Sequence, residues 1–408
     1  KIAKYQGIIE YHAENHWINC SLTLHIHKKA GTKEFILLKN IDTEIDKVSA
    51  LMNDQVIRID YEVPLLDSLK IMLPETLESQ AELIVKIEYI MNLPDNETGI
   101  HFVSRWYPYI PENFANWNVQ AKIPDGVSLI FPGEHQIANT KEGLKTYSLE
   151  NTTAWTNYPF IISRNNSIRH SEETVKETQL HFYFHGINKP GTKDIIGEHT
   201  QSFTFYEELI GSYHFSHFTM AEVPKLQGIK QYPAFELPGS NYVDYYNVGL
   251  NKWPAAKMAA QWFGQGVKAH ETDTMEYIFM ALNQYLRLMF IEKSQGAKAY
   301  IKITDKLLND FKYMVLRTSR NIPLVEGNGK VIDLKGPFAF HILRKEMGDM
   351  NWKKFLQFLY SDYYNQYLSY IDFKNAAIDF GSSEKIPEIF SIWFETKGLP
   401  DEYIKQKK

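Results

Sequence analysis

Several features that would place this chain in a particular protein class are absent or nearly so. It has a single cysteine, Cys20, so no disulfide can form within it. No apolar run approaches the roughly 20 residues of a membrane-spanning helix, and no secretory signal peptide is recognisable. Because the first residue is Lys1 and not methionine, we expect a segment upstream: a cleaved signal, a tag or part of a larger native protein.

Motifs of several common enzyme classes are also missing. No glycine-rich phosphate loop and no G-x-S-x-G nucleophile motif is present, and no internal repeat stands out. The net charge is −5, whereas nucleic-acid-binding proteins concentrate positive charge. We therefore expect neither nucleotide-dependent chemistry nor a nucleic-acid partner.

The composition is that of a folded protein with large aromatic cores. Of 408 residues, 44% are hydrophobic, 23% charged and 14% aromatic. This length is sufficient for two or three domains of ordinary size.

The first half of the sequence has the period of β-strands. Apolar residues alternate with polar ones from Ile18 to Ile26 and again from Leu83 to Tyr89, which indicates half-buried strands. Turn signals stand at 94–96 and 124–126. We predict an all-β, antiparallel domain over residues 1–203.

The second half changes to helical spacing. Between Met275 and Phe290 apolar residues recur three and four positions apart, which predicts a long amphipathic helix. Further helices are expected near 254–268, 297–318, 337–347, 351–366, 372–380 and 386–395. A second domain would then span residues 204–408, with the hinge near 202–206.

The most informative stretch is residues 256–264, A-K-M-A-A-Q-W-F-G. It is similar to H-E-x-x-H followed by Q-W-F-G, in which two histidines one helical turn apart bind zinc and the glutamate polarises the attacking water. Here Ala256 and Ala260 stand at the histidine positions and Lys257 stands at the glutamate position. The frame of the motif is present without its chemical groups.

Other segments, in order along the chain, match the same kind of protein. They are R-W-Y-P at 105–108, F-Y-E-E-L-I-G at 205–211, E-V-P at 222–224, K-G at 335–336 with H-I-L-R at 341–344, D-F at 372–373, W-F at 393–394 and G-L-P at 398–400. Together they resemble the aminopeptidase N family of gluzincin zinc peptidases over most of the chain. The resemblance implies an α+β multidomain fold: an N-terminal antiparallel β-saddle domain followed by a thermolysin-like α/β domain.

The resemblance also implies that the zinc site is degenerate. The family's third ligand is a glutamate nineteen residues after the second histidine, which is Phe279 here, or Glu276 if the loop is three residues shorter. One carboxylate cannot replace the three protein ligands of catalytic zinc, and the charge of Lys257 would repel the cation. We expect no zinc and no catalysis.

The remaining chemistry of the family is altered as well. Its substrate strand, G-x-M-E-N, corresponds to residues 228–232, where Gln231 replaces the glutamate that binds the substrate amine. A neutral amide cannot supply that charge-assisted bond. Asp333 replaces the transition-state tyrosine of Y-x-K-G, and its carboxylate would repel an oxyanion.

The resemblance implies a substrate cleft, and four residues are the candidates for lining what remains of it. The two aromatic residues among them would also suit a hydrophobic core. The four candidates are Gly228, Gln231, Tyr232 and Trp262.

Two histidine pairs could serve a different metal site. His25 and His27 lie on one face of a predicted strand, and exposure to solvent is the simpler interpretation. His214 and His217 lie in a predicted loop, where packing is the better explanation.

A remodelled metal site could instead use His270, Asp273 or Glu276, which are near the altered helix in sequence. Helix capping explains these residues more simply. His341 lies on an apolar helix face and is expected to be a core histidine.

Our leading hypothesis is a catalytically inactive, aminopeptidase-like binding or scaffold module with a peptide or protein partner. A peptide could add as a strand along residues 227–235. Peptidase-like domains of this family also occur with bacterial ABC-type permeases. By that analogy the partner is a membrane transporter and the location extracytoplasmic or membrane-associated in a bacterium, with the cytoplasm left open.

Two alternatives remain. One is an active zinc aminopeptidase with a remodelled metal site. The other is a purely structural domain, in which Lys257 would pair with Glu276, Asp273 or Asp333 in a closed cleft. A binding module would instead keep an open cleft lined by aromatic residues.

Overall fold

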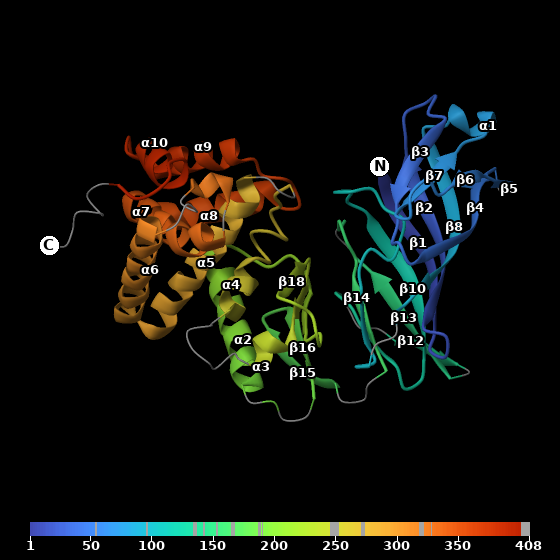
Figure 1. Cartoon of the computed structure of the whole chain (residues 1–408), viewed down its shortest axis with the longest axis horizontal. Coiled ribbons are helices and arrows are strands. Elements are labelled where there is room, and N and C mark those ends of the chain that lie inside the picture. Colours follow the sequence, from blue (N-terminus) through green and yellow to red (C-terminus); the bar gives the residue numbers. More distant parts are fainter. Residues whose placement is uncertain are drawn as a thin grey trace. The chain divides into compact units, whose positions relative to one another are not determined.

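The structure is a computed structural model, and its contacts divide the chain into two compact units. It describes residues 1–53, 55–94, 97–133, 137–141, 143–151, 154–164, 168–186, 189, 191–244, 253–270, 274–317, 322–327 and 329–400. The first unit comprises Lys1–Glu172, Gln179–Asn188 and Phe215–Asn241, and the second comprises Glu173–Thr178, Lys189–His214 and Tyr242–Lys408. The first is built from sheets and the second mainly from helices (Figure 1).

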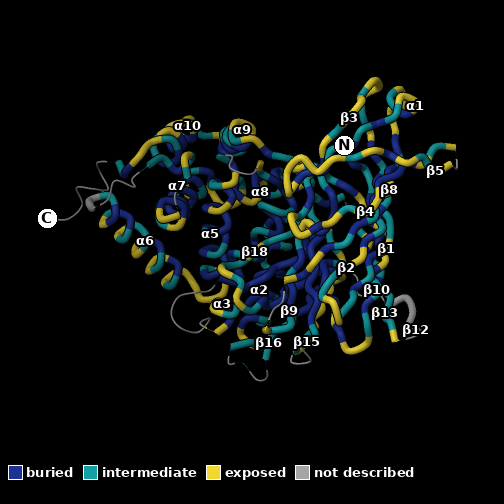
Figure 2. Tube along the Cα trace, turned by 45° about the vertical axis from the view of Figure 1, so that its right-hand side comes forward, coloured by how far each residue is buried: buried dark blue, intermediate teal, exposed yellow. Residues whose placement is uncertain are grey.

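Among the described residues, eight strands form the largest sheet, in the order β12-β13-β10-β1-β2-β8-β4-β5. Their bounds are β1 (Ile2–His12), β2 (Trp17–His27), β4 (Thr43–Met52), β5 (Gln55–Arg58), β8 (Glu82–Asn92), β10 (Asn116–Pro124), β12 (Ile137–Lys141) and β13 (Leu144–Glu150). Strand β2 buries every second residue from Ile18 to Ile26, and β8 does so from Leu83 to Tyr89 (Figure 2). Both predicted strands are confirmed.

The direction of one strand pair differs from the expectation. Strands β1 and β10 pair in parallel, whereas the other pairs of this sheet are antiparallel. Neighbouring antiparallel strands can be joined by a hairpin, but β1 and β10 are far apart in sequence, so no turn fixes their direction. Alternation of apolar residues is the same in either direction and could not reveal this pair.

One of the two expected turns lies within the described residues. At 124–126 the Val127 N–H donates to the Pro124 carbonyl at 3.1 Å, and Gly126 has φ of 82°. The turn is confirmed. The segment 94–96 falls mostly outside the described residues.

Two three-stranded sheets also belong to the first unit, in the orders β3-β7-β6 and β11-β14-β9. They are built from β3 (Glu34–Leu38), β6 (Asp60–Glu62), β7 (Ser68–Met72), β9 (Ile100–Val103), β11 (Ser128–Ile130) and β14 (Phe160–Ser163), with a short helix α1 (Glu75–Glu78).

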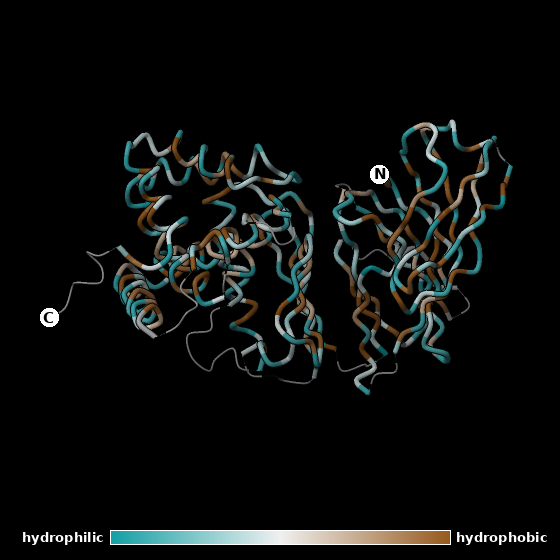
Figure 3. The backbone as a smooth tube through the Cα atoms, turned by 45° about the horizontal axis from the view of Figure 1, so that its top comes forward, coloured by the Kyte–Doolittle hydropathy of each residue, from teal (hydrophilic) through white to brown (hydrophobic). Residues whose placement is uncertain are grey.

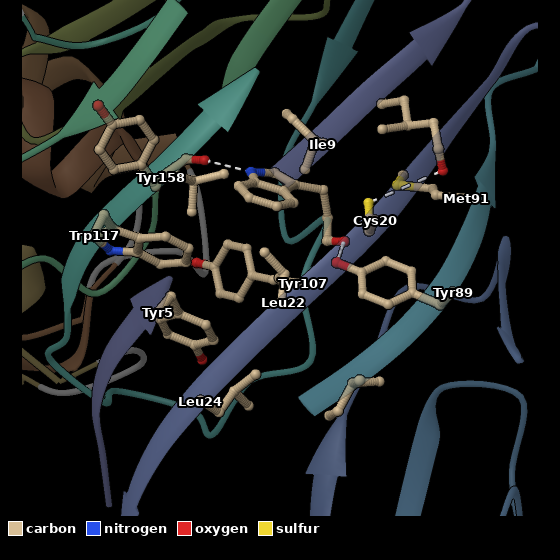
Figure 4. Close-up of a cluster of buried hydrophobic side chains, with 14 of the residues drawn as sticks. Tyr5, Ile9, Cys20, Leu22, Leu24, Tyr89, Met91, Tyr107, Trp117 and Tyr158 are labelled. Atoms are coloured by element: carbon tan, nitrogen blue, oxygen red, sulfur yellow. Dashed lines mark hydrogen bonds between the residues drawn. The ribbon is translucent and has the colours of Figure 1, made fainter. Parts of the chain in front are cut away.

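Aromatic side chains fill the core of this unit, as the composition predicts. The Trp106 indole N–H donates to the Tyr158 carbonyl at 2.7 Å, and the Tyr89 hydroxyl donates to the Trp106 carbonyl at 2.8 Å (Figure 4). The Tyr107 and Trp117 rings meet edge to face with centroids 4.4 Å apart. The segment R-W-Y-P at 105–108 therefore contributes to packing.

A five-stranded sheet has the order β15-β16-β17-β19-β18. Its strands are β15 (Ile168–Val175), β16 (Thr178–His185), β17 (His217–Ala221), β18 (Ile229–Tyr232) and β19 (Phe235–Pro238). β16 pairs with β17 and β17 with β19 in parallel, while β18 and β19 form an antiparallel hairpin. The sheet is mixed, and β18 forms one of its edges.

The second half is mainly helical. Its described helices are α2 (Thr192–Leu209), α3 (Ser240–Asp244), α4 (Trp253–Ala259), α5 (Thr274–Gln295), α6 (Ala297–Arg317), α7 (Gly336–Met347), α8 (Asp349–Tyr363), α9 (Tyr370–Gly381) and α10 (Ile386–Ile389), with a 3₁₀ turn η1 (Leu324–Glu326) and π-helical turns η2 (Val331–Lys335) and η3 (Phe390–Phe394). Helices α2 and α3 were not predicted, whereas the other helices correspond to predicted segments. Hydrophobic and hydrophilic residues alternate along the helices near the C-terminus (Figure 3). In the described part of the chain, no helix combines the length and hydrophobicity needed to cross a membrane.

Helices α4 and α2 differ from the prediction. Helix α4 ends at Ala259 instead of 268, because wider turns follow it: the Gln265 N–H bonds to the Ala260 carbonyl and the Gly266 N–H to the Gln261 carbonyl. Helix α2 begins at Thr192, so the last residues of the segment predicted as all-β are helical. The boundary at 203–204 falls inside α2 and stays a prediction.

Candidate functional site

Helix α4 carries the first residues, 256–259, of the segment that resembles an altered zinc motif, and it is anchored through its first turn. The buried Glu198 of α2 accepts a hydrogen bond from the Ala255 N–H at 3.4 Å, and the Tyr206 hydroxyl donates to the Ala255 carbonyl at 2.9 Å. Ala256 follows at 5% exposure, and Ala260 lies just beyond the end of the helix. The backbone of the motif is firmly held, but its two ligand positions carry methyl groups.

The two positions considered for the third ligand lie on α5. Phe279 is 3% exposed, and its ring packs against that of Phe263 with centroids 5.9 Å apart. Glu276 is exposed in the first turn of the helix. The residues in place thus provide no nitrogen ligand and at most one carboxylate, which does not fit the three protein ligands of a gluzincin zinc.

Charged side chains interact around this helix. Burial raises the pKa of Asp333, and the positive charges of Arg287 and Lys257 act in the opposite direction. Burial lowers the pKa of Arg287, against the influence of Tyr206, Glu198 and Asp333. Lys257 is therefore close enough to interact with Asp333, as one of the sequence hypotheses required. Two cationic side chains already balance the carboxylates of this network, which disfavours the addition of a metal cation.

Asp333 is presented by the π-helical turn η2, which leads directly into α7. Two residues further on, the Lys335 ammonium is 1% exposed and donates to the Thr396 carbonyl. Burial lowers the pKa of Lys335 to about 8. Gly336 is required by close packing, since a Cβ there would lie 2.5 Å from the Ala281 Cβ. The K-G pair is thus explained by packing.

The β18–β19 hairpin carries the residues for which the sequence predicts a correspondence to a substrate strand. Gln231 is paired with Glu236 across the hairpin, and its Nε2 donates to Oε2 of Glu236 at 2.9 Å. Glu236 is fully buried. Gly228 opens the hairpin with φ of 83°, a conformation that favours glycine. A buried carboxylate therefore lies beside the neutral amide of Gln231 and accepts a hydrogen bond from it.

Tyr232 and Trp262 have different environments. The Tyr232 ring is half-buried and lies near Phe102, with centroids 6.0 Å apart. Trp262 has no exposed surface, and its indole N–H donates to the Gly211 carbonyl at 3.0 Å. It packs against Phe203 at 5.5 Å. Trp262 thus belongs to the core of the helical unit, while Tyr232 retains some access to solvent.

The histidines of the first predicted pair belong to the first unit and contact different residues. His25 contacts Gln6 at 2.7 Å and His27 contacts Glu82 at 3.4 Å, so the two histidines have separate partners.

The remaining single histidines contact tyrosines. His214 lies against Tyr364, with centroids 4.0 Å apart. His270 stacks on Tyr367 at 4.0 Å, and His341 accepts or donates a 2.6 Å hydrogen bond with the Tyr300 hydroxyl. Residues 271–273, which include Asp273, are outside the described residues.

Sequence reasoning missed two buried carboxylates, Glu236 in the first unit and Glu198 in the second, and the Arg287 side chain that acts on Asp333. Glu236 gives the clearest signal, because it interrupts the apolar strand F-E-L-P at 235–238. A charge in a buried strand requires a partner, and this rule could have identified it. Glu198 and Arg287 lie on amphipathic helices, where a charge is ordinarily read as solvent-exposed.

The sequence-predicted residues fall into two sets. The hairpin residues, Gly228, Gln231 and Tyr232, belong to the first unit, and the altered zinc motif with Asp333 belongs to the second.

Comparison with known proteins identifies the fold. No protein-family model matches the sequence, and no curated protein matches it significantly. The M1 zinc metallopeptidase from Deinococcus radiodurans matches in structure with a TM-score of 0.77 at 15% identity, covering 98% of this chain and 94% of that one.

Two variants of such enzymes match equally well. A glutamate-to-alanine variant of a two-domain M1 zinc metallopeptidase, bound to L-tryptophan, has a TM-score of 0.78 at 15% identity, covering 98% and 95%. A glutamate-to-alanine variant of the Deinococcus radiodurans enzyme bound to a Tyr-Ser-Ala substrate has 0.77 at 15%, covering 98% and 95%.

The chain therefore has the α+β multidomain fold of two-domain M1 zinc metallopeptidases. An N-terminal β-sheet domain is followed by a helical domain like their catalytic one. At this level of identity the likeness concerns the fold alone.

Proposed function

We propose that this chain is a catalytically inactive, aminopeptidase-like module that binds an extended peptide or protein segment. The observation that carries the proposal is the combination of a ligand-free zinc motif with a retained edge strand. Ala256, Lys257 and Ala260 offer no lone pair for zinc at neutral pH, while β18 still ends its sheet.

The edge strand provides a means of binding a peptide that does not depend on catalytic groups. An extended segment can pair with β18 through backbone hydrogen bonds, which need no particular side chain. Within the strand, Lys230 is exposed and Gln231 and Tyr232 are half-buried, so ligand side chains would meet a mixed polar and aromatic surface.

Solved structures with this fold give a parallel. A glutamate-to-alanine variant of the Deinococcus radiodurans enzyme is bound to a Tyr-Ser-Ala substrate, so that variant holds a peptide despite its substitution. We extend peptide binding to the present chain, in which we propose that more of the chemical groups are replaced.

The wider setting of the proposal follows the family analogy. We place the module outside the cytoplasm or at the membrane of a bacterium, as the peptide- or protein-binding part of a transporter-associated assembly. Co-purification with a membrane permease from the native host supports this setting, and recovery of the protein as an isolated cytoplasmic species contradicts it.

Catalytic inactivity is tested with aminoacyl-4-nitroanilides covering basic, aromatic and aliphatic residues, with added zinc and with a chelator. We expect no release of nitroaniline above that of a heat-denatured sample. Zinc-dependent release that is lost on chelation would establish the alternative, an aminopeptidase with a remodelled metal site.

Binding is tested with a library of fluorescent peptides, followed by N-methylated versions of each hit. N-methylation removes backbone donors, so alternate methylated positions should lose affinity if the peptide pairs with β18. Ile229→Pro, in β18, removes an N–H that faces the free edge and should weaken binding, whereas Arg58→Pro, at the equivalent position of the edge strand β5 of the large sheet, is the matched control. Equal binding by both proline variants would exclude β18, and a library without hits would favour a purely structural domain.

A further inference from the structure

The first unit contains a cluster of metal-ligand side chains that is separate from the altered zinc motif. His170 and Glu172 lie on β15, and His181 lies on the adjacent strand β16. One ligand atom from each of the three lies within 4.8 Å of the other two. We propose that these residues form a binding site for a zinc-class divalent transition metal on this sheet.

Strand geometry explains how the three side chains come together. Successive side chains of a strand point to opposite faces, so His170 and Glu172, two residues apart, share one face of β15. The His170 Nε2 and His181 Nδ1 atoms are 3.1 Å apart, which places His181 on that face as well. An H-x-E pair and one histidine of the neighbouring strand are therefore sufficient to build the cluster.

The distances suit a single ion between the ligands. In the metal-free chain the His170 Nε2 and His181 Nδ1 atoms share a hydrogen bond of 3.1 Å, and a bound ion would replace its proton. Zn–N bonds of about 2.0–2.1 Å in a tetrahedral site place two nitrogen ligands about 3.3 Å apart, close to this spacing. The Glu172 Oε2 atom is 3.9 Å from His181 Nδ1. Because the Glu172 side chain is 44% exposed, rotation of its carboxylate can close the remaining gap.

Both imidazoles are held in position by neighbouring rings. The His170 ring stacks on Tyr183 with centroids 4.5 Å apart, and the His181 ring stacks on His217 at 5.6 Å. His217 itself contacts Ser216 and Gln179 through its two ring nitrogens, at 2.8 and 3.1 Å. It is therefore a positioning residue beside the cluster and not a ligand.

The donor atoms of the cluster suit a transition metal. Imidazole and carboxylate ligands together suit zinc and its neighbours in the first transition series. His170 and Glu172 are exposed while His181 is 5% exposed, so an ion can enter from solvent and be held by an ordered ligand.

The site is tested by titrating untagged, chelator-treated protein with Zn²⁺ in a calorimeter. We expect one zinc per chain. His170→Ala should weaken binding by at least the roughly 10- to 100-fold that loss of an outer-shell partner costs, with a smaller loss in Glu172→Gln. His27→Ala, which removes an exposed histidine of β2, is the matched control and should bind zinc as the wild type does.

Two further measurements distinguish this site from zinc bound elsewhere on the chain or between two chains. The visible absorption of bound Co²⁺ should report nitrogen and oxygen ligands in the wild type and disappear in His170→Ala, while Tm without metal stays unchanged. Unaltered zinc affinity in both His170→Ala and Glu172→Gln would overturn the proposal, as would one zinc per two chains with dimerisation. Nitroanilide hydrolysis plays no part in these readouts, so the result is independent of the proposed lack of catalysis.

Discussion

Gln231 and Glu236 face each other across the β18–β19 hairpin, where the amide of one donates to the carboxylate of the other at 2.9 Å. Because Glu236 is fully buried, this hydrogen bond satisfies part of a charge that would otherwise be costly. The amide is therefore matched to its neighbour, and restoring the family's glutamate at this position would place two carboxylates in contact.

Gln231→Glu is expected to destabilise the protein at neutral pH. The lost hydrogen bond to a charged group alone is worth about 1.5–3 kcal/mol, and repulsion between the carboxylates adds to it. The loss should diminish in acid, where one of the two is protonated. Urea unfolding at pH 5 and pH 7 measures this, with Lys230→Glu as the exposed control on the same strand. A Gln231→Glu protein as stable as wild type at pH 7 would contradict the buried pairing.

The Asp333→Asn variant should gain stability relative to the wild type as the pH rises. The pKa of Asp333 is raised by burial, so its protonated form stabilises the fold fully below the unfolded-state pKa of about 3.9. That contribution is lost as the pH rises through the folded-state pKa, and asparagine has no such loss. The difference in unfolding free energy between Asp333→Asn and wild type should therefore shift in favour of the variant from pH 4 to pH 7.

The charge partners of Asp333 provide the control for this prediction. Lys257→Met removes a positive charge that lowers the pKa of Asp333, so the same shift should grow in a Lys257→Met background. A difference that is constant with pH in both backgrounds would show that Asp333 does not titrate as the structure indicates.

Restoring the zinc motif on α4 should not restore a peptidase. The triple variant Ala256→His, Lys257→Glu, Ala260→His still has Phe279 in place of the third ligand, and Asp333 remains near the new glutamate. We expect weak zinc binding and no nitroanilide hydrolysis, measured by calorimetry and absorbance in a His170→Ala background so that the β15–β16 cluster does not contribute. Robust hydrolysis by this variant would show that the hairpin and Asp333 are no obstacle to catalysis.

Gly336→Ala should destabilise the helical unit by about 1–3 kcal/mol through overpacking. The added methyl group would lie 2.5 Å from the Ala281 Cβ, and Ala281→Gly in the same chain should recover part of the loss. Gly329→Ala, where no atom lies within 4 Å of the added Cβ, is the control and should be nearly neutral. Thermal unfolding of the wild type and these variants measures the effect, and equal Tm values for Gly336→Ala and Gly329→Ala would refute the close contact.

The sequence predicted those parts of the fold that depend on local periodicity. Strands β2 and β8 and helix α5 follow directly from apolar residues at spacings of two or of three and four. The parallel pairing of β1 with β10 could not be predicted, since it depends on residues far apart in the chain. The end of α4 at Ala259 depends on wider turns that no residue pattern marks.

The features of the candidate site also divide into those visible in local sequence and those that depend on residues far apart in the chain. The replacements at Ala256, Lys257 and Asp333 were visible because each could be set beside a known motif. The pairing of Gln231 with Glu236 needed the register of a hairpin, and the influence of Arg287 on Asp333 needed two helical segments to meet. The sequence named Asp333 as one possible partner of Lys257, whereas the partners of Glu236 and the action of Arg287 required the tertiary structure.

Cys20 offers a practical consequence of the packing in β2. Burial raises the pKa of its thiol to about 12, so almost no reactive thiolate forms at neutral pH. In labelling reactions the folded chain should behave as though it contained no cysteine. A single thiol introduced on the edge strand, as in Lys230→Cys, would then carry a fluorophore or spin label without background, and ligand arrival at β18 could be followed directly.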